Sequence, residues 1–326
     1  MRSAARGDAR RSAALAVGRL CYFRLAYLTM SEAEAYLVEA VQRGDEAAWR
    51  EVIGRYEGRL LSFARRMLAQ RSEAEDLVQE TFLGLLRSLS RYDRRRSLET
   101  YLFAILRHKL SDHFRRQPPG QRQSLETLEL DEGAEAWLST ETPSGHMADQ
   151  ERIAAQRAAL VECLRQYVEQ CRQQRRFQEL IVIEMLMVLG MRNKEVAADM
   201  GLTETAVAGI KFRTLERWRQ LTQASAAARD WQEADLAATS TVARIWREEG
   251  VSCLKRSTLG RYLLGALDDD WAAYVEFHVE VAGCDRCLAN LDDLRSEDAG
   301  SDADRERLRE RCFASSVGFL KADAGS

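Results

Sequence analysis

Glu73 to Arg116 reads EAEDLVQETFLGLLRSLSRYDRRRSLETYLFAILRHKLSDHFRR, and this stretch decides the fold that we predict for the chain. Its apolar residues recur at helical spacing on both sides of a basic turn, so it predicts two helices. The first helix is acidic and apolar, whereas the second is crowded with arginine and aromatic side chains. Two such different surfaces side by side indicate two different partners, one a protein and the other a nucleic acid.

The composition predicts an all-α protein built from small domains. The chain has 326 residues, of which 46% are hydrophobic, and it contains only three prolines. Alanine, leucine, glutamate and arginine dominate, and these residues favour helix over strand. We therefore expect two small helical domains joined by an acidic linker, followed by a helical C-terminal extension.

The first 29 residues are rich in arginine, and Arg19 and Arg24 interrupt their apolar run. A signal peptide needs an uninterrupted apolar segment, so we interpret residues 1–29 as a disordered or over-annotated leader. No apolar run is long enough to cross a membrane. The seven cysteines are unevenly spaced, unlike a secreted disulfide framework. These features predict a cytoplasmic protein with no membrane partner.

Residues 30–117 are predicted to form the first helical domain. Asp45 is expected to cap a helix, and Ser72 is expected to cap the next one, whose first turn is acidic. That helix carries an apolar stripe, which an ordinary amphipathic helix would also have. The residues that lie largely off the stripe are Asp76, Gln79, Glu80 and Arg87.

Arginines beside aromatic rings mark the second half of the opening stretch. Surfaces of this kind bind single-stranded nucleic acid, because bases stack on the rings while the cations meet the phosphates. A charge run is also typical of a solvated face, and both interpretations stay open at this point. The candidate rings are Tyr92, Tyr101, Phe103 and Phe114, and the candidate cations are Arg94, Arg95, Arg96, Arg107, Lys109, Arg115 and Arg116.

Residues 118–150 are predicted to be an acidic linker that follows the second helix. Pro118 and Pro119 end that helix, and the segment beyond them is too long for a simple turn. The linker is either a plain solvated tether or an acidic mimic of nucleic acid inside a positively charged channel.

Residues 151–223 are predicted to contain a helix-turn-helix. Lys194–Met200 forms the short helix, Gly201 the turn, and Thr203 the cap of a helix over Glu204–Leu221. The second helix of such a motif enters the DNA major groove, and the alternative is a helical hairpin with no DNA role. The candidate contacts are Thr203, Thr205, Ala208, Gly209, Lys211, Phe212 and Arg213, with Arg217 and Arg219 placed for phosphates.

The order of these parts over about residues 31–223, with the motif DLVQETF in the first domain, resembles the extracytoplasmic-function (ECF) class of bacterial RNA polymerase sigma factors. The resemblance implies binding to core RNA polymerase, at the β′ clamp and the β flap, and to promoter DNA, with no cofactor required. The residues that it implies for the clamp are Asp76, Leu77, Gln79, Glu80 and Phe82. It implies that residues 91–116 melt and capture the −10 strand and that residues 194–219 read the −35 element. Tyr101 stands where the family usually has a tryptophan.

Residues 224–295 lie outside that architecture and carry His278, Cys284 and Cys287 in the pattern H-x5-C-x2-C, with Cys253 upstream. One histidine and three cysteines suit a closed zinc site, although buried cysteines in a helical hairpin fit the pattern too. The region resembles the zinc-binding domains of anti-sigma factors, with a spacer two residues longer. The resemblance implies a built-in regulator that masks the other domains, or binding to a separate anti-sigma factor. Residues 296–326 are expected to be a frayed polar tail.

The function predicted from these parts is a sigma factor, a binding protein and not an enzyme. The alternative is a free-standing helix-turn-helix repressor with a helical sensor domain. DLVQETF favours the first prediction, because a repressor has no need of an acidic helix that binds polymerase. The chain contains no Gly-rich phosphate loop, nucleophile elbow or pair of catalytic carboxylates.

Overall fold

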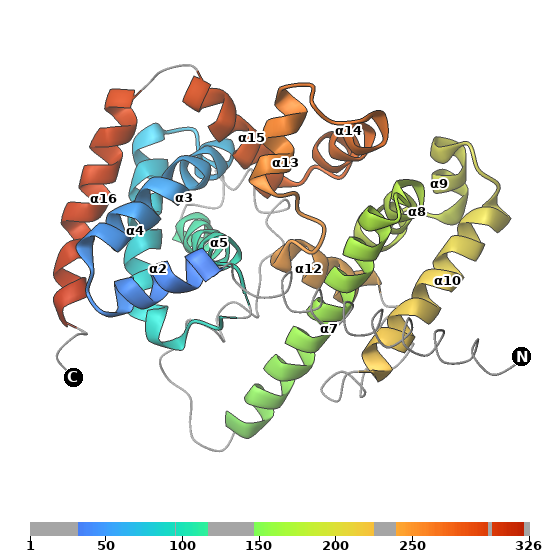
Figure 1. Cartoon of the computed structure of the whole chain (residues 1–326), viewed down its shortest axis with the longest axis horizontal. Coiled ribbons are helices and arrows are strands. Elements are labelled where there is room, and N and C mark those ends of the chain that lie inside the picture. Colours follow the sequence, from blue (N-terminus) through green and yellow to red (C-terminus); the bar gives the residue numbers. More distant parts are fainter. Residues whose placement is uncertain (1–31, 95, 117–146, 225–238, 299–301, 323–326) are drawn as a thin grey trace, which may run out of the picture.

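The computed structural model describes residues 32–94, 96–116, 147–224, 239–298 and 302–322, and every regular element in these ranges is a helix (Figure 1). The leader, most of the acidic linker and Arg95 lie outside the described residues. The all-α prediction is therefore confirmed for the part that is described. No helix in this part is long and apolar enough to span a membrane.

The first helical module surrounds a core of large aromatic side chains. Trp49 meets Phe82 edge-on at 5.8 Å, and Phe63 meets Phe103 in the same way at 5.2 Å. All four rings are almost completely buried, which favours one fixed packing of the helices. The elements are α2 (Glu32–Gln42), α3 (Glu46–Met67), α4 (Arg71–Ser88), the 3₁₀ turn η1 (Leu89–Arg91) and α5 (Leu98–Arg116).

Helix starts in this module only partly follow the sequence. Asp45 caps α3 as expected, since its carboxylate accepts the backbone N–H groups of Ala47 and Ala48. The expected cap by Ser72 is wrong, because the N-cap is Gln70 and α4 begins two residues earlier than expected, at Arg71. The Arg71 side chain is bonded to Glu75 one turn along the helix, at 2.7 Å, and this pair supports the two additional residues.

The second module contains the helix-turn-helix geometry that the sequence predicts. Gly201 ends the short helix with a φ of 62°, a left-handed conformation that glycine adopts readily. Thr203 then caps the longer helix, and its hydroxyl accepts the N–H of Ala206 at 3.2 Å. The elements are α7 (Met147–Gln173), α8 (Phe177–Ile183), the π-helical turn η2 (Glu184–Val188), α9 (Asn193–Met200) and α10 (Glu204–Gln223).

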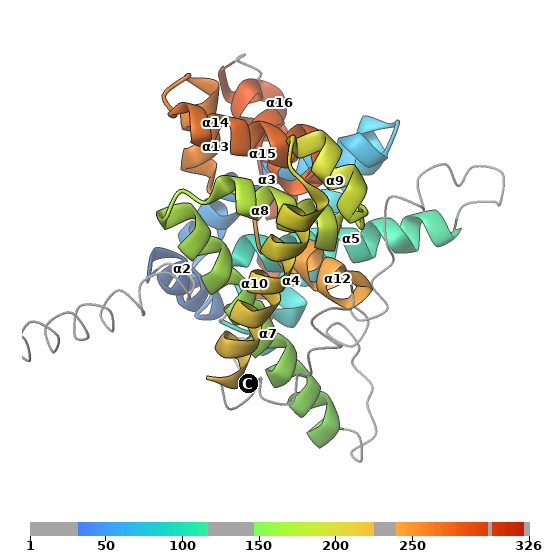
Figure 2. The same cartoon turned by 90° about the vertical axis from the view of Figure 1, so that its right-hand side faces the viewer.

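The extension contacts both modules, with its helices α12 to α14 between them and its last helix, α16, on the outer side of the first module (Figure 1). Its first helix packs against η2 and α7 of the second module, whereas its last two helices pack against α3 of the first. The turned view keeps α15 and α16 beside α3 as well (Figure 2). The elements are α12 (Thr239–Glu249), α13 (Arg256–Leu263), α14 (Asp269–Glu276), the π-helical turn η3 (Phe277–Val281), α15 (Asp285–Asp298) and α16 (Asp302–Ala322).

The expectation of a frayed polar tail after residue 295 is wrong, because most of the described tail is helix α16. Four of its side chains, namely Leu308, Cys312, Phe313 and Leu320, are buried in the core of the first module. Their spacing places them on one side of a helix, and burying them offsets the entropy of ordering the segment.

Candidate functional site

Helix α4 presents its acidic residues outward and its apolar residues inward. The Asp76 and Glu80 side chains are 68% and 53% exposed, and Gln79 is half-buried. Leu77 and Phe82 lie in the core instead, so in this conformation neither side chain is accessible to a partner. Phe82 is held there by its edge-on contact with Trp49.

Helix α16 runs parallel to α4 along the face that carries Asp76. Asp304 pairs with Arg71 at the start of α4 at 2.9 Å. One turn or so further on, Arg311 lies 3.3 Å from Asp76. The order of the contacts is the same in both helices, so α16 lies parallel to α4 and contacts the edge of the predicted polymerase-binding face at Asp76.

The same helix is anchored to α3 by a buried hydrogen bond. The Trp49 indole donates its N–H to the Ser316 hydroxyl at 2.8 Å, inside the core. The Arg50 guanidinium lies 3.5 Å from the centre of the Phe313 ring, and Arg309 pairs with the buried Glu57 at 2.8 Å. These contacts satisfy polar groups that burial would otherwise leave unpaired.

The rings predicted to stack on bases are buried. Tyr92, Tyr101, Phe103 and Phe114 are all less than a tenth exposed, and Tyr92 packs against Tyr101 at 5.0 Å. The prediction that they form an exposed stacking surface is therefore wrong for this conformation. Their aromatic area stabilises the core of the module, which periodicity alone cannot distinguish from an exposed face.

The predicted cations around these rings lie in different environments. Arg94 pairs with Glu39 at 2.7 Å and Lys109 pairs with Glu80 at 3.2 Å, whereas Arg115 and Arg116 are exposed. Arg96 is only 12% exposed, because Glu249 of the extension binds it.

Arg107 is half-buried near the extension, beside the Phe63 ring at 5.6 Å. Burial lowers the pKa of its guanidinium, and the positive charge of Arg286 lowers it further.

The helix-turn-helix presents a free edge of α10. Thr203, Thr205 and Ala208 are exposed, together with Arg213 and with Phe212, whose exposed fraction is 71%. Lys211 is half-buried, and so is Arg217, which donates to the Gln170 side chain of α7 at 3.0 Å. The exposed residues are therefore accessible for the predicted contacts with a DNA groove, whereas Arg217 joins α10 to α7.

The four predicted metal ligands come together in the extension. The ligand atoms of Cys253, His278, Cys284 and Cys287 all lie within 4.8 Å of one another. Gly283 has a φ of 60° and makes the turn that brings the Cys-x2-Cys segment back towards His278. Burial is almost complete for His278 and Cys287 and partial for the other two.

Zinc fits this set of donors. Two sulfurs on one tetrahedral zinc lie about 3.8 Å apart if each Zn–S bond is about 2.3 Å. The Cys253 and Cys284 sulfurs are 3.5 Å apart. Hydrogen bonds from Cys253 and Cys287 hold the pKa of Cys284 well below its usual value, whereas the contacts among the same three thiols raise the pKa of Cys287, so one thiolate is favoured, at Cys284.

Glu184 of η2, which the sequence analysis missed, supports the cluster from the second module. Its carboxylate is 1% exposed and lies 3.4 Å from Nδ1 of His278. It also accepts hydrogen bonds from Tyr274 at 2.7 Å and Ser252 at 3.1 Å. A carboxylate on the second nitrogen of a ligating histidine orients the ring and raises its basicity.

With this geometry established, the comparisons with known proteins define the class of the first module. The family model for sigma-70 region 2 matches residues 52–118, which run from α3 to just beyond α5. The matched residues include the acidic face of α4.

Related curated proteins narrow the class. The RNA polymerase sigma-H factor of Pseudomonas aeruginosa is 30% identical over 36% of this chain and 62% of its own length. The ECF RNA polymerase sigma factor SigF of Caulobacter vibrioides is 38% identical over 30% of this chain and 56% of its own length. The ECF RNA polymerase sigma factor SigD of Mycobacterium tuberculosis is 29% identical over 56% of this chain and 81% of its own length.

Together these matches support an ECF-class sigma factor, as the motif and the order of the helices indicate. The chain spans less than two thirds of the length of the first of these relatives. No solved structure matches the chain.

Proposed function

We propose that this protein is a sigma factor that binds core RNA polymerase in the cytoplasm and directs promoter recognition and DNA melting. The observation that carries the proposal is the presence, in one chain, of a sigma-70 region 2 domain and an exposed helix-turn-helix. A repressor would need only the second of these.

The polymerase-binding surface in this proposal is the outward face of α4, formed by Asp76, Gln79 and Glu80 against the β′ clamp, while the second module meets the β flap. The exposed fractions of Asp76 and Glu80 support this assignment. The proposed −10 contacts are Arg94, Arg95, Arg96, Arg107, Lys109, Arg115 and Arg116. The proposed −35 contacts are Thr203, Thr205, Ala208, Lys211, Phe212 and Arg213.

A binding experiment with core polymerase tests the proposal. The full chain should be retained by immobilised core, and the double variant Asp76→Ala, Glu80→Ala should be retained much less. Glu51→Ala is the matched control, because Glu51 is equally exposed (53%) on the neighbouring helix α3. A chain that ignores core but binds duplex DNA by itself would refute the proposal and support the repressor.

The extension regulates the sigma modules in this proposal by pairing with Asp76 at the edge of the α4 face and by burying Arg96, until a signal releases it. The contacts that support this role are those of Arg311 with Asp76 and of Glu249 with Arg96. A separate anti-sigma factor is then not needed to keep the protein inactive.

One structural zinc is proposed to hold the extension together through Cys253, His278, Cys284 and Cys287. When bound, the metal would fix the thiolates and the ring and contribute folding energy to a small domain. Elemental analysis of the purified chain should give one zinc, which Cys284→Ser should lose. Cys163→Ser is the control, because Cys163 is a buried cysteine outside the cluster. Equal zinc in both variants would contradict the assignment.

A further inference from the structure

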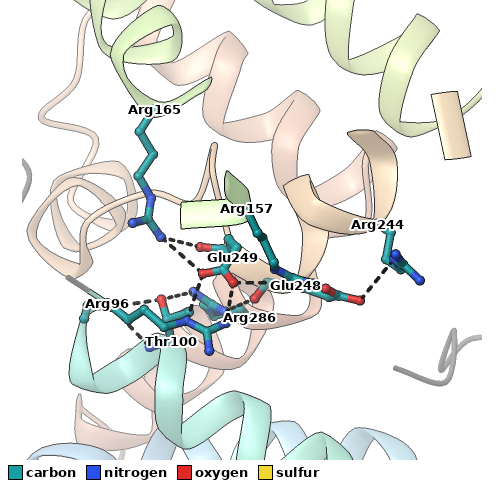
Figure 3. Close-up of polar contacts among 9 residues, drawn as sticks. Arg96, Thr100, Arg157, Arg165, Arg244, Glu248, Glu249 and Arg286 are labelled. Atoms are coloured by element: carbon teal, nitrogen blue, oxygen red, sulfur yellow. Dashed lines mark hydrogen bonds and ion pairs between the residues drawn. The ribbon is translucent and has the colours of Figure 1, made fainter. Parts of the chain in front are cut away.

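Two carboxylates at the end of α12 lie among arginines that come from both sigma modules (Figure 3). Glu249 is only 4% exposed. Arg96, which precedes α5, donates from Nε to its carboxylate at 3.1 Å and makes a second bond through Nη2. This paired arrangement is the one that a guanidinium also offers to a phosphate group.

Helix α7 supplies two further arginines to the same carboxylates. Nη2 of Arg157 lies 3.4 Å from Glu249 and is also bonded to Glu248. Nη2 of Arg165 lies 3.9 Å from the Glu249 carboxylate and donates to its backbone oxygen at 2.8 Å. We call Arg96, Arg157 and Arg165 the arginine cluster, and its members are 12%, 15% and 24% exposed.

The arginine cluster requires an anion in order to stay assembled. Guanidinium groups remain charged in proteins, and several of them close together at a poorly hydrated site repel one another. Removing one partner of a buried ion pair leaves a charge that water no longer reaches. When α12 leaves, the three arginines must therefore separate or take up another anion.

We propose that the arginine cluster is a binding site for backbone phosphates of nucleic acid, and that Glu248 and Glu249 fill it in the closed form. Arg96 belongs to the proposed −10 surface, whereas the two arginines of α7 extend the site beyond it. The inference rests on the proposed function only in naming promoter DNA as the source of the phosphates. The carboxylates then act as a displaceable internal substitute for a DNA strand.

Binding of a fluorescent single-stranded oligonucleotide of mixed sequence to the full chain tests the proposal. Glu249→Gln keeps the size of the side chain, removes its charge, and should tighten binding at least about tenfold. The salt dependence of log K should steepen by up to about 2, since each of three new phosphate contacts on a single strand adds about 0.7. Glu276→Gln, the same change at an exposed residue of α14, should have no effect.

A second pair of changes separates the proposed site from a simple internal lock. Adding Arg157→Gln and Arg165→Gln to Glu249→Gln should abolish the gain in affinity and in salt dependence. If Glu249→Gln exposes α12 to hydrogen exchange while affinity and salt dependence stay unchanged, the cluster is a lock only, and the proposal is wrong. If Glu249→Gln does not fold, Glu248→Gln, which removes the charge of the second carboxylate, should give a smaller gain, and no gain with Glu248→Gln overturns the proposal equally.

A competition experiment with inorganic phosphate shows whether the cluster binds free phosphate or the phosphates of a nucleic acid. Phosphate should compete with the oligonucleotide for binding to Glu249→Gln. If phosphate binds to this variant but the oligonucleotide does not, the cluster accepts only small anions and the proposal is wrong. The oligonucleotide assay contains no polymerase. Its failure is therefore distinguishable from failure of the proposed function, which is read from retention on core.

Discussion

Replacing Leu308 by alanine should release α16 from the first module. Leu308 is 3% exposed within the core that α16 shares with α3 and α4. A buried Leu→Ala change costs about 2–5 kcal/mol of stability. We expect a cost of about 2–3 kcal/mol here, because α16 lies at the edge of the module. The substitution weakens the docking of α16 by this amount, because the side chain at position 308 is exposed to water in the open form and has no packing to lose there. The ratio of closed to open chain should then fall about 30- to 150-fold, since 1.4 kcal/mol is about a factor of ten.

The assay is the equilibrium affinity of the full chain for core polymerase. If core binds only the open chain, the apparent Kd is the intrinsic value divided by the open fraction. Leu308→Ala should therefore tighten binding by up to the same factor, until the open form predominates. Leu264→Ala is the matched control, because Leu264 is 81% exposed. Faster amide exchange across α4 with an unchanged Kd would refute the reasoning, since α16 would then be covering a face that core does not use.

Three further predictions concern charged residues at the α4–α16 contact, beside the proposed zinc site and in the arginine cluster. Arg311→Glu places a negative charge beside Asp76 and should speed exchange in α4, by an amount that high salt reduces; a salt-independent effect would contradict an electrostatic cause. Glu184→Ala should lower zinc affinity about 10- to 100-fold in competition with a chromophoric chelator, and unchanged affinity would remove Glu184 from any role at the metal. Burial raises the pKa of Glu249, but the surrounding arginines outweigh it and hold the pKa below its ordinary 4.5. Its contribution to the closed form is complete above that value and is lost as the pH falls through the lowered pKa, so α12 should stay protected from exchange between about pH 7 and pH 5. Release of α12 already within that range would contradict this sign.

The local parts of the fold could be predicted from the sequence. Gly201 and Thr203 predict the turn and the cap of the helix-turn-helix, and both do so through bonds within a few residues of themselves. The clustering of Cys284, Cys287 and His278 could be predicted for a related reason, because their short spacing limits where the two cysteines can lie relative to the histidine.

Exposure could not be predicted in the same way. Phe82 and Tyr101 lie at positions that fit either a core or a binding face, and the choice depends on helices far away in the chain. Arg96 and Glu249 are 153 residues apart, and no local pattern marks two charged residues as buried partners. The helix that begins at residue 302 did carry a signal in its spaced apolar residues, which a surrounding run of arginine and acidic residues concealed.

Glu184 has a consequence for the portability of the extension. The carboxylate belongs to η2 of the helix-turn-helix module, whereas the histidine that it supports belongs to η3 of the extension. Grafted onto another chain, the extension would carry the four proposed zinc ligands but not the carboxylate that lies beside His278. The extension is therefore not a self-contained domain, because it depends on η2 of the other module. A change at residue 184 would alter the surroundings of His278 although Glu184 is not itself a proposed ligand.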